Sequence, residues 1–182
     1  AGHTAGRARS VAAVCGAGNN GGDALAVLRR LSFAGWRCLS AVVPEALHAT
    51  AARRLAEARA AGVAILRLGS SEAEAAVAES SVVLDGVAGI GFSGPARGEA
   101  AAAMALVRGA RGAVVAIDVP SGVEPYRGVA SYRDVAPEAL VRADYTLSVS
   151  PLKAELFYPG YRPNAGTILP VRARVKSPAG SC

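Results

Sequence analysis

The stretch that decides the fold reads Val11-Ala-Ala-Val-Cys15, followed directly by Gly16-Ala-Gly-Asn-Asn-Gly-Gly-Asp23. Its first five residues are a short and continuously apolar run, which is typical of a buried β-strand. The glycines that follow satisfy the pattern G-x-G-x-x-G, and the segment 21–34 has apolar residues at helical spacing. Gly35 then ends the expected helix. A strand that turns through glycines into a helix predicts the first crossover unit of an α/β sheet, with room for a phosphate at the helix N-terminus.

Short apolar runs alternate with longer amphipathic segments along the rest of the chain. Further strands are expected at 37–43, 63–68, 81–85, 113–118, 145–149 and 167–171, and helices at 46–61, 71–78, 98–109 and 137–142. Ser70 and Glu74 at the start of the 71–78 helix resemble a capping box. The alternation predicts an α/β fold with a mostly parallel sheet that is covered by helices on both faces.

The chain of 182 residues is long enough for one domain with a full core, since 52% of its residues are hydrophobic. No internal repeat or linker divides it. We therefore expect a single domain over 1–182, with a core that spans about 11–171 and flexible ends at 1–10 and 175–182.

Charge, aromatic content and cysteine content exclude several classes of function. The net charge is +6, but the arginines are scattered and aromatic residues make up only 5%, which argues against nucleic-acid binding. No apolar run is long enough to cross a bilayer and the first residues do not resemble a secretory signal, so we expect a cytoplasmic protein with no membrane partner. Cys15, Cys38 and Cys182 have no paired spacing, so buried free thiols are expected rather than disulfides or a zinc site.

Ligands of an open parallel sheet bind beyond the carboxyl ends of its strands, so the segments that follow the strands are the candidate sites. The first of them is the glycine loop 16–23, in which Asn19 and Asn20 add side-chain carbonyls that suit a ligand or a cation. An ordinary dinucleotide site also needs an acidic residue at the end of the second strand, and Glu45 comes late, after a proline. A tight turn without a ligand is the alternative for this loop.

Two further expected strands end in an aspartate. Asp85 is followed by the loop 86–95, whose four glycines can expose backbone N–H groups to an anion or can simply form a flexible connection. Asp118 is followed by Val-Pro-Ser121-Gly, and its carboxylate can act as a general acid or base or can cap the turn. A serine hydrolase is excluded because the sequence contains no G-x-S-x-G.

The fourth candidate segment, 151–160, reads Pro-Leu-Lys-Ala-Glu-Leu-Phe-Tyr-Pro-Gly and follows the expected strand 145–149. Lys153 could supply a positive charge beside a phosphate, but we interpret it as a solvated residue at a helix end. His3 and His48 lie outside all four segments, which argues against an imidazole-based mechanism or a histidine-ligated zinc.

The four segments together resemble the YjeF N-terminal family, from about Val11 to about Val171 and in the family's order. They read G-x-G-N-N-G-G-D, D-x(3)-G-x-G-F-S-G-P, I-D-x-P-S-G and K-x(3)-F-x-P-G. The resemblance implies a three-layer αβα sandwich of Rossmann type. The activity that it implies is epimerisation at C6 of the hydrated nicotinamide ring in NADHX and NADPHX, the damaged forms of NADH and NADPH. It also implies a separate dehydratase as a partner, and a homodimer is a further expectation.

The resemblance also implies which residues act. Asn20, Asp85 and Ser121 fall where the family binds a potassium ion (K+), and their amide, carboxylate and hydroxyl oxygens suit a hard cation. C6 of the hydrate is a hemiaminal carbon, which can lose and regain its hydroxyl or open reversibly. Either route needs a group that moves a proton, and Asp118 is the candidate. The implied substrate contacts are Asn19, Asn20, Gly21, Gly22, Asp23, Gly89, Ile90, Gly91, Phe92, Ser93, Gly94, Pro95 and Asp118.

Some positions depart from the family pattern. Ser93 stands where the eukaryotic members carry a lysine, and Ala24 follows Asp23 where the family has a glycine. Only ten residues precede the first expected strand, where the family usually has one or two helices, so we expect a fragment or a divergent member. Two alternatives to an epimerase stay open: a catalytically inactive nucleotide-binding or scaffold module of the same fold, and an ordinary NAD-dependent oxidoreductase.

Overall fold

A seven-stranded parallel sheet forms the centre of the molecule. The structure is a computed structural model and describes residues 10–124 and 137–172. The strands lie in the order β3-β2-β1-β4-β5-β6-β7, and every neighbouring pair is parallel. They are β1 (Ser10–Cys15), β2 (Cys38–Val43), β3 (Ala64–Arg67), β4 (Val82–Gly86), β5 (Ala113–Ile117), β6 (Tyr145–Val149) and β7 (Thr167–Val171).

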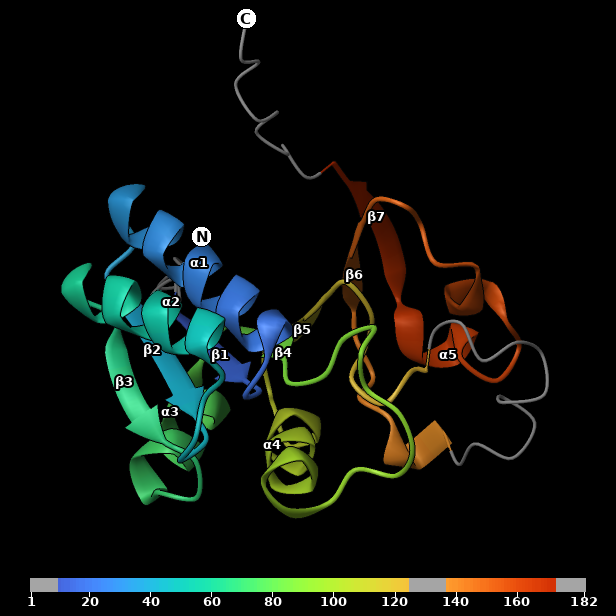
Figure 1. Ribbon diagram of the computed structural model, residues 1–182, viewed down its shortest axis with the longest axis horizontal. Helices are drawn as coiled ribbons and strands as arrows, with labels where there is room; N and C mark the ends of the chain where they lie inside the picture. The colour runs from blue at the N-terminus through green and yellow to red at the C-terminus, as the bar shows by residue number, and fades with distance from the viewer. Residues whose placement is uncertain (1–9, 125–136, 173–182) are drawn as a thin grey trace, which may run out of the picture.

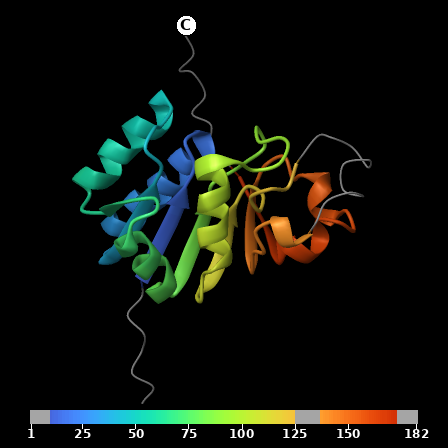
Figure 2. The same ribbon diagram turned by 90° about the horizontal axis from the view of Figure 1, so that it is seen from below.

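Helices cover both faces of the sheet, as Figures 1 and 2 show. On one face lie α1 (Asn19–Phe33) and α2 (Ala49–Ala60), which pack against each other. On the other lie α3 (Ser71–Glu79) and α4 (Gly98–Arg108). Three short helices, η1 (Pro137–Ala139), η2 (Ala154–Phe157) and α5 (Arg162–Ala165), accompany the last two strands. This is the α/β, Rossmann-like, three-layer architecture that the sequence predicts.

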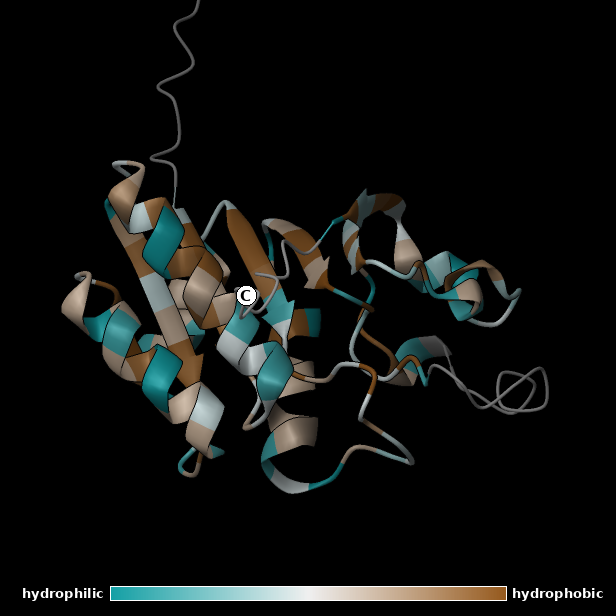
Figure 3. Cartoon of the chain, turned by 45° about the horizontal axis from the view of Figure 1, so that its top comes forward, coloured by the Kyte–Doolittle hydropathy of each residue, from teal (hydrophilic) through white to brown (hydrophobic). Residues whose placement is uncertain are grey.

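Alternating side chains of the central strands fill two separate cores. Ala13 of β1 faces α1 and packs with Leu25 and Leu28, whereas its neighbour Val14 faces the other way and packs with the core under α3 and α4. All of these side chains are fully buried. Figure 3 shows the brown, apolar strands enclosed between helices that carry teal, hydrophilic patches. Burial on both faces explains why the sequence of β1 is continuously apolar rather than alternating.

The sheet is less completely covered at the edge formed by its last two strands, β6 and β7. On the face of the sheet that α1 covers, β6 and β7 are partly open to solvent. The side chains of Tyr145, Leu169 and Val171 are 45%, 43% and 39% exposed there. On the opposite face, Thr146 and Ser148 of β6 are buried, and a third core gathers around Tyr161, Leu156 and Val119. The short helices η2 and α5 supply much of this third core.

Most expected elements form within two or three residues of their expected bounds, and four details differ. The expected helix 137–142 is only the single 3-10 turn η1, and η2 and α5 were not predicted. The Ser70 hydroxyl caps α3 by accepting from the Ala73 N–H at 3.2 Å. The capping box is incomplete, because the Ser70 N–H donates to the Arg67 carbonyl (3.1 Å) rather than to Glu74.

The expectation of buried thiols is right for Cys15 and wrong for Cys38. Cys15 is buried, and desolvation raises the pKa of its thiol to about 12. Cys38 is exposed because it is the first residue of β2, ahead of the part of the strand that the helices cover. Ser10, expected in a flexible end, belongs to β1. Cys182, His3 and the remaining expected flexible residues, 1–9 and 175–182, lie outside the described residues. None of the described helices is long and apolar enough to cross a membrane.

Candidate active site

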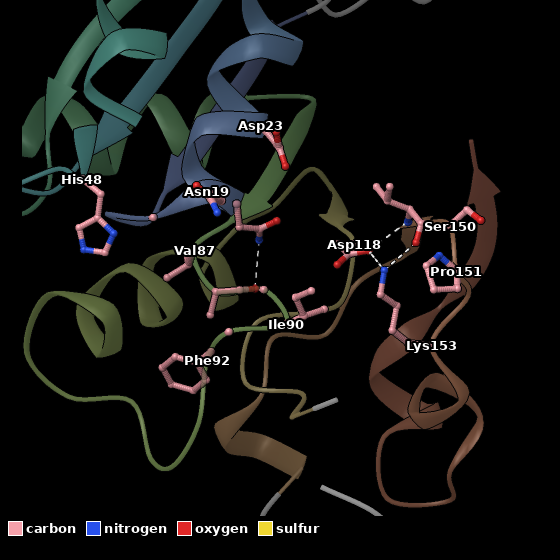
Figure 4. A pocket seen from close by; sticks show the side chains of 16 residues that line it. Asn19, Asp23, His48, Val87, Ile90, Phe92, Asp118, Ser150, Pro151 and Lys153 are labelled. Carbon is pink, nitrogen blue, oxygen red and sulfur yellow. Dashed lines mark hydrogen bonds and ion pairs between the residues drawn. The ribbon is translucent and has the colours of Figure 1, made fainter. Parts of the chain in front are cut away.

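A cavity of about 650 Å³ opens beside β1 and β4, where the order in which the chain adds strands to the sheet reverses. From β1 the chain crosses to β2 and β3 on one side, and then returns to β4 on the other side of β1. The loops after β1 and β4 therefore diverge, and such a switch point is the usual ligand crevice of an open α/β sheet. The volume lies in the range of small-molecule and cofactor sites. The cavity is lined by Gly18, Asn19, Asn20, Asp23, His48, Val87, Ala88, Gly89, Ile90, Gly91, Phe92, Asp118, Val149, Ser150, Pro151 and Lys153 (Figure 4).

The glycine loop lets the start of α1 pack directly against the strand ends. A Cβ on Gly21 would lie 2.0 Å from the Gly16 carbonyl oxygen, and a Cβ on Gly16 would lie 1.9 Å from the Val87 carbonyl oxygen. The Gly16 N–H donates to the Gly86 carbonyl at 2.9 Å, which ties the loop to β4. No side chain caps α1, and its first turn contains no acidic residue. Its first N–H groups are therefore available to an anionic ligand.

A buried polar cluster lies beneath the cavity, around the backbone of Ala88. The Asp85 carboxylate accepts from the Ser121 hydroxyl at 2.5 Å and from the Ser121 N–H at 2.8 Å. The Ala88 N–H donates to the Ser121 hydroxyl oxygen at 2.8 Å, and the Asn20 side-chain amide donates to the Ala88 carbonyl at 3.0 Å. The structure therefore brings Asn20, Asp85 and Ser121 together, although they come from α1, β4 and the segment after β5.

The Asp85 carboxyl is fully buried, and among the described residues it forms no ion pair. Burial raises its pKa to about 6, although the hydrogen bonds from Ser121 and Val87 lower it in part. An ionised Asp85 therefore lacks a compensating charge, which a cation bound by neutral oxygens and one carboxylate would supply. The described residues contain no group of three His, Cys, Asp or Glu side chains that could hold a metal ion. The oxygens of the cluster come from one carboxylate, one hydroxyl group and one main-chain carbonyl, which are ligands suited to a hard cation.

Asp118 directly follows β5 and adopts a left-handed backbone conformation with a φ of 71°. Its Oδ1 atom accepts from the Lys153 ammonium group, with which it forms an ion pair, and from the Val149 N–H at 3.0 Å. The Lys153 Nζ also donates to the Val149 carbonyl at 2.6 Å. The interpretation of Lys153 as a solvated helix-end residue is therefore wrong: its side chain is 4% exposed. It folds back from the start of η2 toward the end of β6, where the Asp118 carboxylate compensates its charge.

Two more ionisable side chains line the cavity. Asp23 lies on the second turn of α1, and partial burial raises the pKa of its carboxyl. The negative charge of Asp118 raises this pKa further, and the positive charge of Arg54 lowers it. His48 precedes α2, and its backbone N–H donates to the Ala17 carbonyl of the glycine loop at 2.8 Å. His48 is exposed and lies apart from Asp118 and Lys153 in Figure 4.

Not every residue that the sequence singles out reaches the cavity. Eight of the implied substrate contacts line it: Asn19, Asn20, Asp23, Gly89, Ile90, Gly91, Phe92 and Asp118. The other five, Gly21, Gly22, Ser93, Gly94 and Pro95, do not. Gly21 and Gly22 are buried inside α1, and Gly94 donates its N–H to the Glu124 carboxylate at 2.5 Å.

Sequence reasoning missed His48 and Ser150 as cavity residues, whereas Pro151 belongs to the candidate segment 151–160. His48 follows β2 by five residues, so the rule about strand ends applies to it as well as to Glu45. Ser150 follows β6 directly and carries the same signal, but the expected candidate segment began one residue later, at Pro151.

The sequence is similar to proteins of one family. The profile described as "YjeF-related protein N-terminus" matches residues 3–154. An "NAD(P)H-hydrate epimerase" of Limosilactobacillus fermentum is 30% identical over 89% of this chain and 74% of its own length. The protein of the same name from Microbacterium testaceum is 36% identical over 81% of this chain and 55% of its own length. A "Bifunctional NAD(P)H-hydrate repair enzyme Nnr" of Thermofilum pendens is 34% identical over 83% of this chain and 29% of its own length.

The chain thus spans less than two thirds of the length of the last two relatives. The crystal structure of yeast ynu0 has a TM-score of 0.68 to this structure at 19% identity, and the match covers 81% of this chain and 60% of that one. This likeness shows the shared fold. Because the family profile matches most of the chain and the L. fermentum protein matches along most of its length, the chain belongs to the family of YjeF-related protein N-termini.

Proposed function

We propose that this domain is an NAD(P)H-hydrate epimerase, which interconverts the R and S forms of NADHX and NADPHX at C6 of the hydrated nicotinamide ring. The observation that carries the proposal is the Asp118 carboxylate, which lines a nucleotide-sized cavity and is oriented by Lys153. The family to which the chain belongs, and the names of the relatives in it, support the choice of substrate.

The two ends of the cavity suit different parts of the substrate. The uncapped N-terminus of α1, which begins at Asn19, is suited to the pyrophosphate. Asp118, which Lys153 orients, supplies the acid–base chemistry, so the hydrated ring belongs beside this pair. Ile90 and Phe92, from the loop after β4, add apolar surface to the cavity. This arrangement explains why one cavity combines backbone donors, apolar side chains and an ion pair.

The hydrogen bonds of Asp118 indicate which of its oxygens moves the proton. Its Oδ1 is occupied by the Lys153 ammonium and the Val149 N–H. Among the described residues, no donor to Oδ2 is present, so Oδ2 is the free acceptor. C6 of the hydrate carries both a hydroxyl group and the ring nitrogen, and its configuration is lost when the C6–O or the C6–N bond breaks. Either route needs a proton transfer at the C6 hydroxyl, and we assign this transfer to Oδ2 of Asp118.

We also propose K+ as the cation that the Asn20, Asp85 and Ser121 cluster would hold. Its charge would compensate the buried Asp85 carboxylate and fix the Ala88 loop, which forms the cavity floor. A separate dehydratase that consumes one epimer is the partner that this activity would serve. The homodimer, the cytoplasmic location and the single-domain boundaries stay predictions.

The test is a turnover assay with separated R and S epimers, read by chromatography against the spontaneous rate. Asp118→Asn should bind the nucleotide normally, because the amide keeps the shape of the carboxylate, but should epimerise about 10²–10⁴-fold more slowly. Glu45→Gln, which neutralises an exposed carboxylate outside the cavity, is the matched control and should turn over normally.

Wild-type protein that does not exceed the spontaneous rate would contradict the proposal and favour the inactive module. Wild-type turnover in Asp118→Asn would show that another group moves the proton. Reduction of NAD+ with a small alcohol would favour the oxidoreductase alternative instead.

A further inference from the structure

A second carboxylate, Asp23, lines the cavity and has no part in the mechanism above. It comes from α1, whereas Asp118 follows β5, so the two carboxyl groups reach the cavity from different elements of the fold. Figure 4 shows the Asp23 side chain extending from α1 toward the space beside Asp118. Burial raises the pKa of the Asp23 carboxyl, and the negative charge of Asp118 contributes to that rise. A ring bound between them would have one carboxyl group on each side.

The surroundings of the two carboxyl groups are unlike. Asp118 is ion-paired with Lys153 and accepts the Val149 N–H. The Asp23 side chain forms no hydrogen bond or ion pair with any residue in the described part of the chain. The charged groups that act on it are Arg54 of α2 and Asp118, and their effects oppose each other, while partial burial favours the neutral form. Two carboxyls in such different surroundings are suited to opposite roles, one as acid and one as base.

We propose that Asp23 is a second catalytic residue, which exchanges a proton with the C6 hydroxyl on the ring face opposite to Asp118. This inference rests on the proposed epimerase function and names the route by which the configuration is inverted. It also selects between the two chemical routes, since loss and return of the hydroxyl on opposite faces needs a proton-transfer group on each face.

In one direction, the hydroxyl group leaves from the face beside Asp23, and water adds on the face beside Asp118. The lone pair of the ring nitrogen forms a C=N bond to C6 as the C6–O bond breaks, and the departing oxygen takes the proton of Asp23 and leaves as water. A second water then attacks C6 from the opposite face, the C=N electrons return to nitrogen, and the proton of this water passes to Asp118. The reverse direction uses the same two groups with their roles exchanged, and proton exchange with solvent restores the starting state.

The route is tested by epimerisation of one pure epimer in water enriched in ¹⁸O, with mass spectrometry of the other epimer at early times. The proposed route breaks the C6–O bond, so enzyme-formed product should carry ¹⁸O at C6. Ring opening breaks the C6–N bond instead and keeps the original oxygen, so unlabelled product would overturn the inference. A reaction without enzyme gives the spontaneous exchange to be subtracted.

The residue is tested by Asp23→Asn, with Asp118→Asn and Glu45→Gln beside it. We expect kcat of Asp23→Asn to fall at least about 10²-fold while KM changes by less than about threefold, because the amide keeps the shape but cannot exchange a proton. The decrease should occur in both directions of epimerisation.

Wild-type kcat in Asp23→Asn, or a change in KM alone, would overturn the inference while leaving the proposed function intact as long as Asp118→Asn is slow. Failure of the function itself would be distinguished by a wild-type rate no higher than the spontaneous one.

Discussion

Ser121 donates both its hydroxyl group and its backbone N–H to the carboxylate of Asp85, at 2.5 and 2.8 Å, in a fully buried position. These neutral donors lower the pKa of Asp85 less than burial raises it, so the pKa lies at about 6. The folded state therefore binds this proton more tightly than the unfolded state does. The resulting stabilisation is fully present below the ordinary aspartate pKa and is lost as the pH rises through about 6.

We expect the unfolding free energy to fall between about pH 4 and pH 7 when K+ and Na+ are replaced by a bulky organic cation. The loss from Asp85 alone is at most about 3 kcal/mol. Added K+ should restore stability at pH 7 but not at pH 4, because it compensates only the ionised carboxylate. Asp85→Asn should lose both the pH dependence and the response to K+. Urea denaturation followed by circular dichroism measures all of these, and equal stability with and without K+ at pH 7 would contradict the cation site.

Lys153 orients the Asp118 carboxylate, so removal of its charge should slow the reaction more than it weakens binding. We expect Lys153→Met, which keeps most of the side-chain volume, to lower kcat by about 10-fold or more while the fold is kept. Lys153→Arg retains the charge and should retain more of the activity than the methionine variant. Steady-state kinetics with both epimers separates kcat from KM, and equal kcat values in the wild type and Lys153→Met would show that the ion pair is dispensable.

The contact between Gly21 and Gly16 predicts a loss of stability rather than of chemistry. In Gly21→Ala, the new methyl group would lie 2.0 Å from the Gly16 carbonyl oxygen, so the backbone must shift. Overpacking of this kind costs about 1–3 kcal/mol or more. Gly91→Ala is the matched control, because no atom lies within 4 Å of a Cβ at that position. Its effect on the urea midpoint should be small, and a similar shift in both variants would refute the steric explanation.

His48 lines the cavity away from the Asp118 and Lys153 pair, so it should affect binding of the nucleotide but not the proton transfer. Loss of one polar contact is worth about 0.5–1.5 kcal/mol, which corresponds to a KM about 2- to 12-fold higher in His48→Ala. The value of kcat should stay unchanged. A lower kcat with normal KM would place His48 near the reacting carbon instead.

The fold could be predicted from the sequence because its signals are local. The apolar run of β1, the glycine loop and the helical spacing of Leu25 and Leu28 are all contained within a few residues of one another. The three short helices at the C-terminal end were missed or misjudged for the opposite reason. Buried Tyr161 and Leu156 pack against Val119, which lies more than thirty residues away, so long-range packing rather than local propensity fixes η2 and α5.

The candidate site was predictable to the extent that its residues follow strands. Asp118 directly follows β5 and Asp85 is the last residue but one of β4, and the parallel register places both at one edge of the sheet. The burial of Lys153 could not be read from its neighbours in sequence, because its partner Asp118 lies thirty-five positions away. A charged side chain in a mixed segment is usually solvated, and only the tertiary structure shows the carboxylate that compensates it.

Ala88 joins the parts of the site without using its side chain. Its N–H reaches Ser121 and its carbonyl reaches Asn20, so the link between α1, β4 and the segment after β5 is made by a single stretch of main chain. Every encoded replacement except proline keeps both groups, so most substitutions would register only whether the new side chain fits. Proline removes the N–H, but its ring also restricts the backbone and so does not isolate the hydrogen bond. Chemical synthesis could expose it, because an ester in place of the peptide bond before Ala88 removes the N–H donor and leaves every side chain in the protein unchanged.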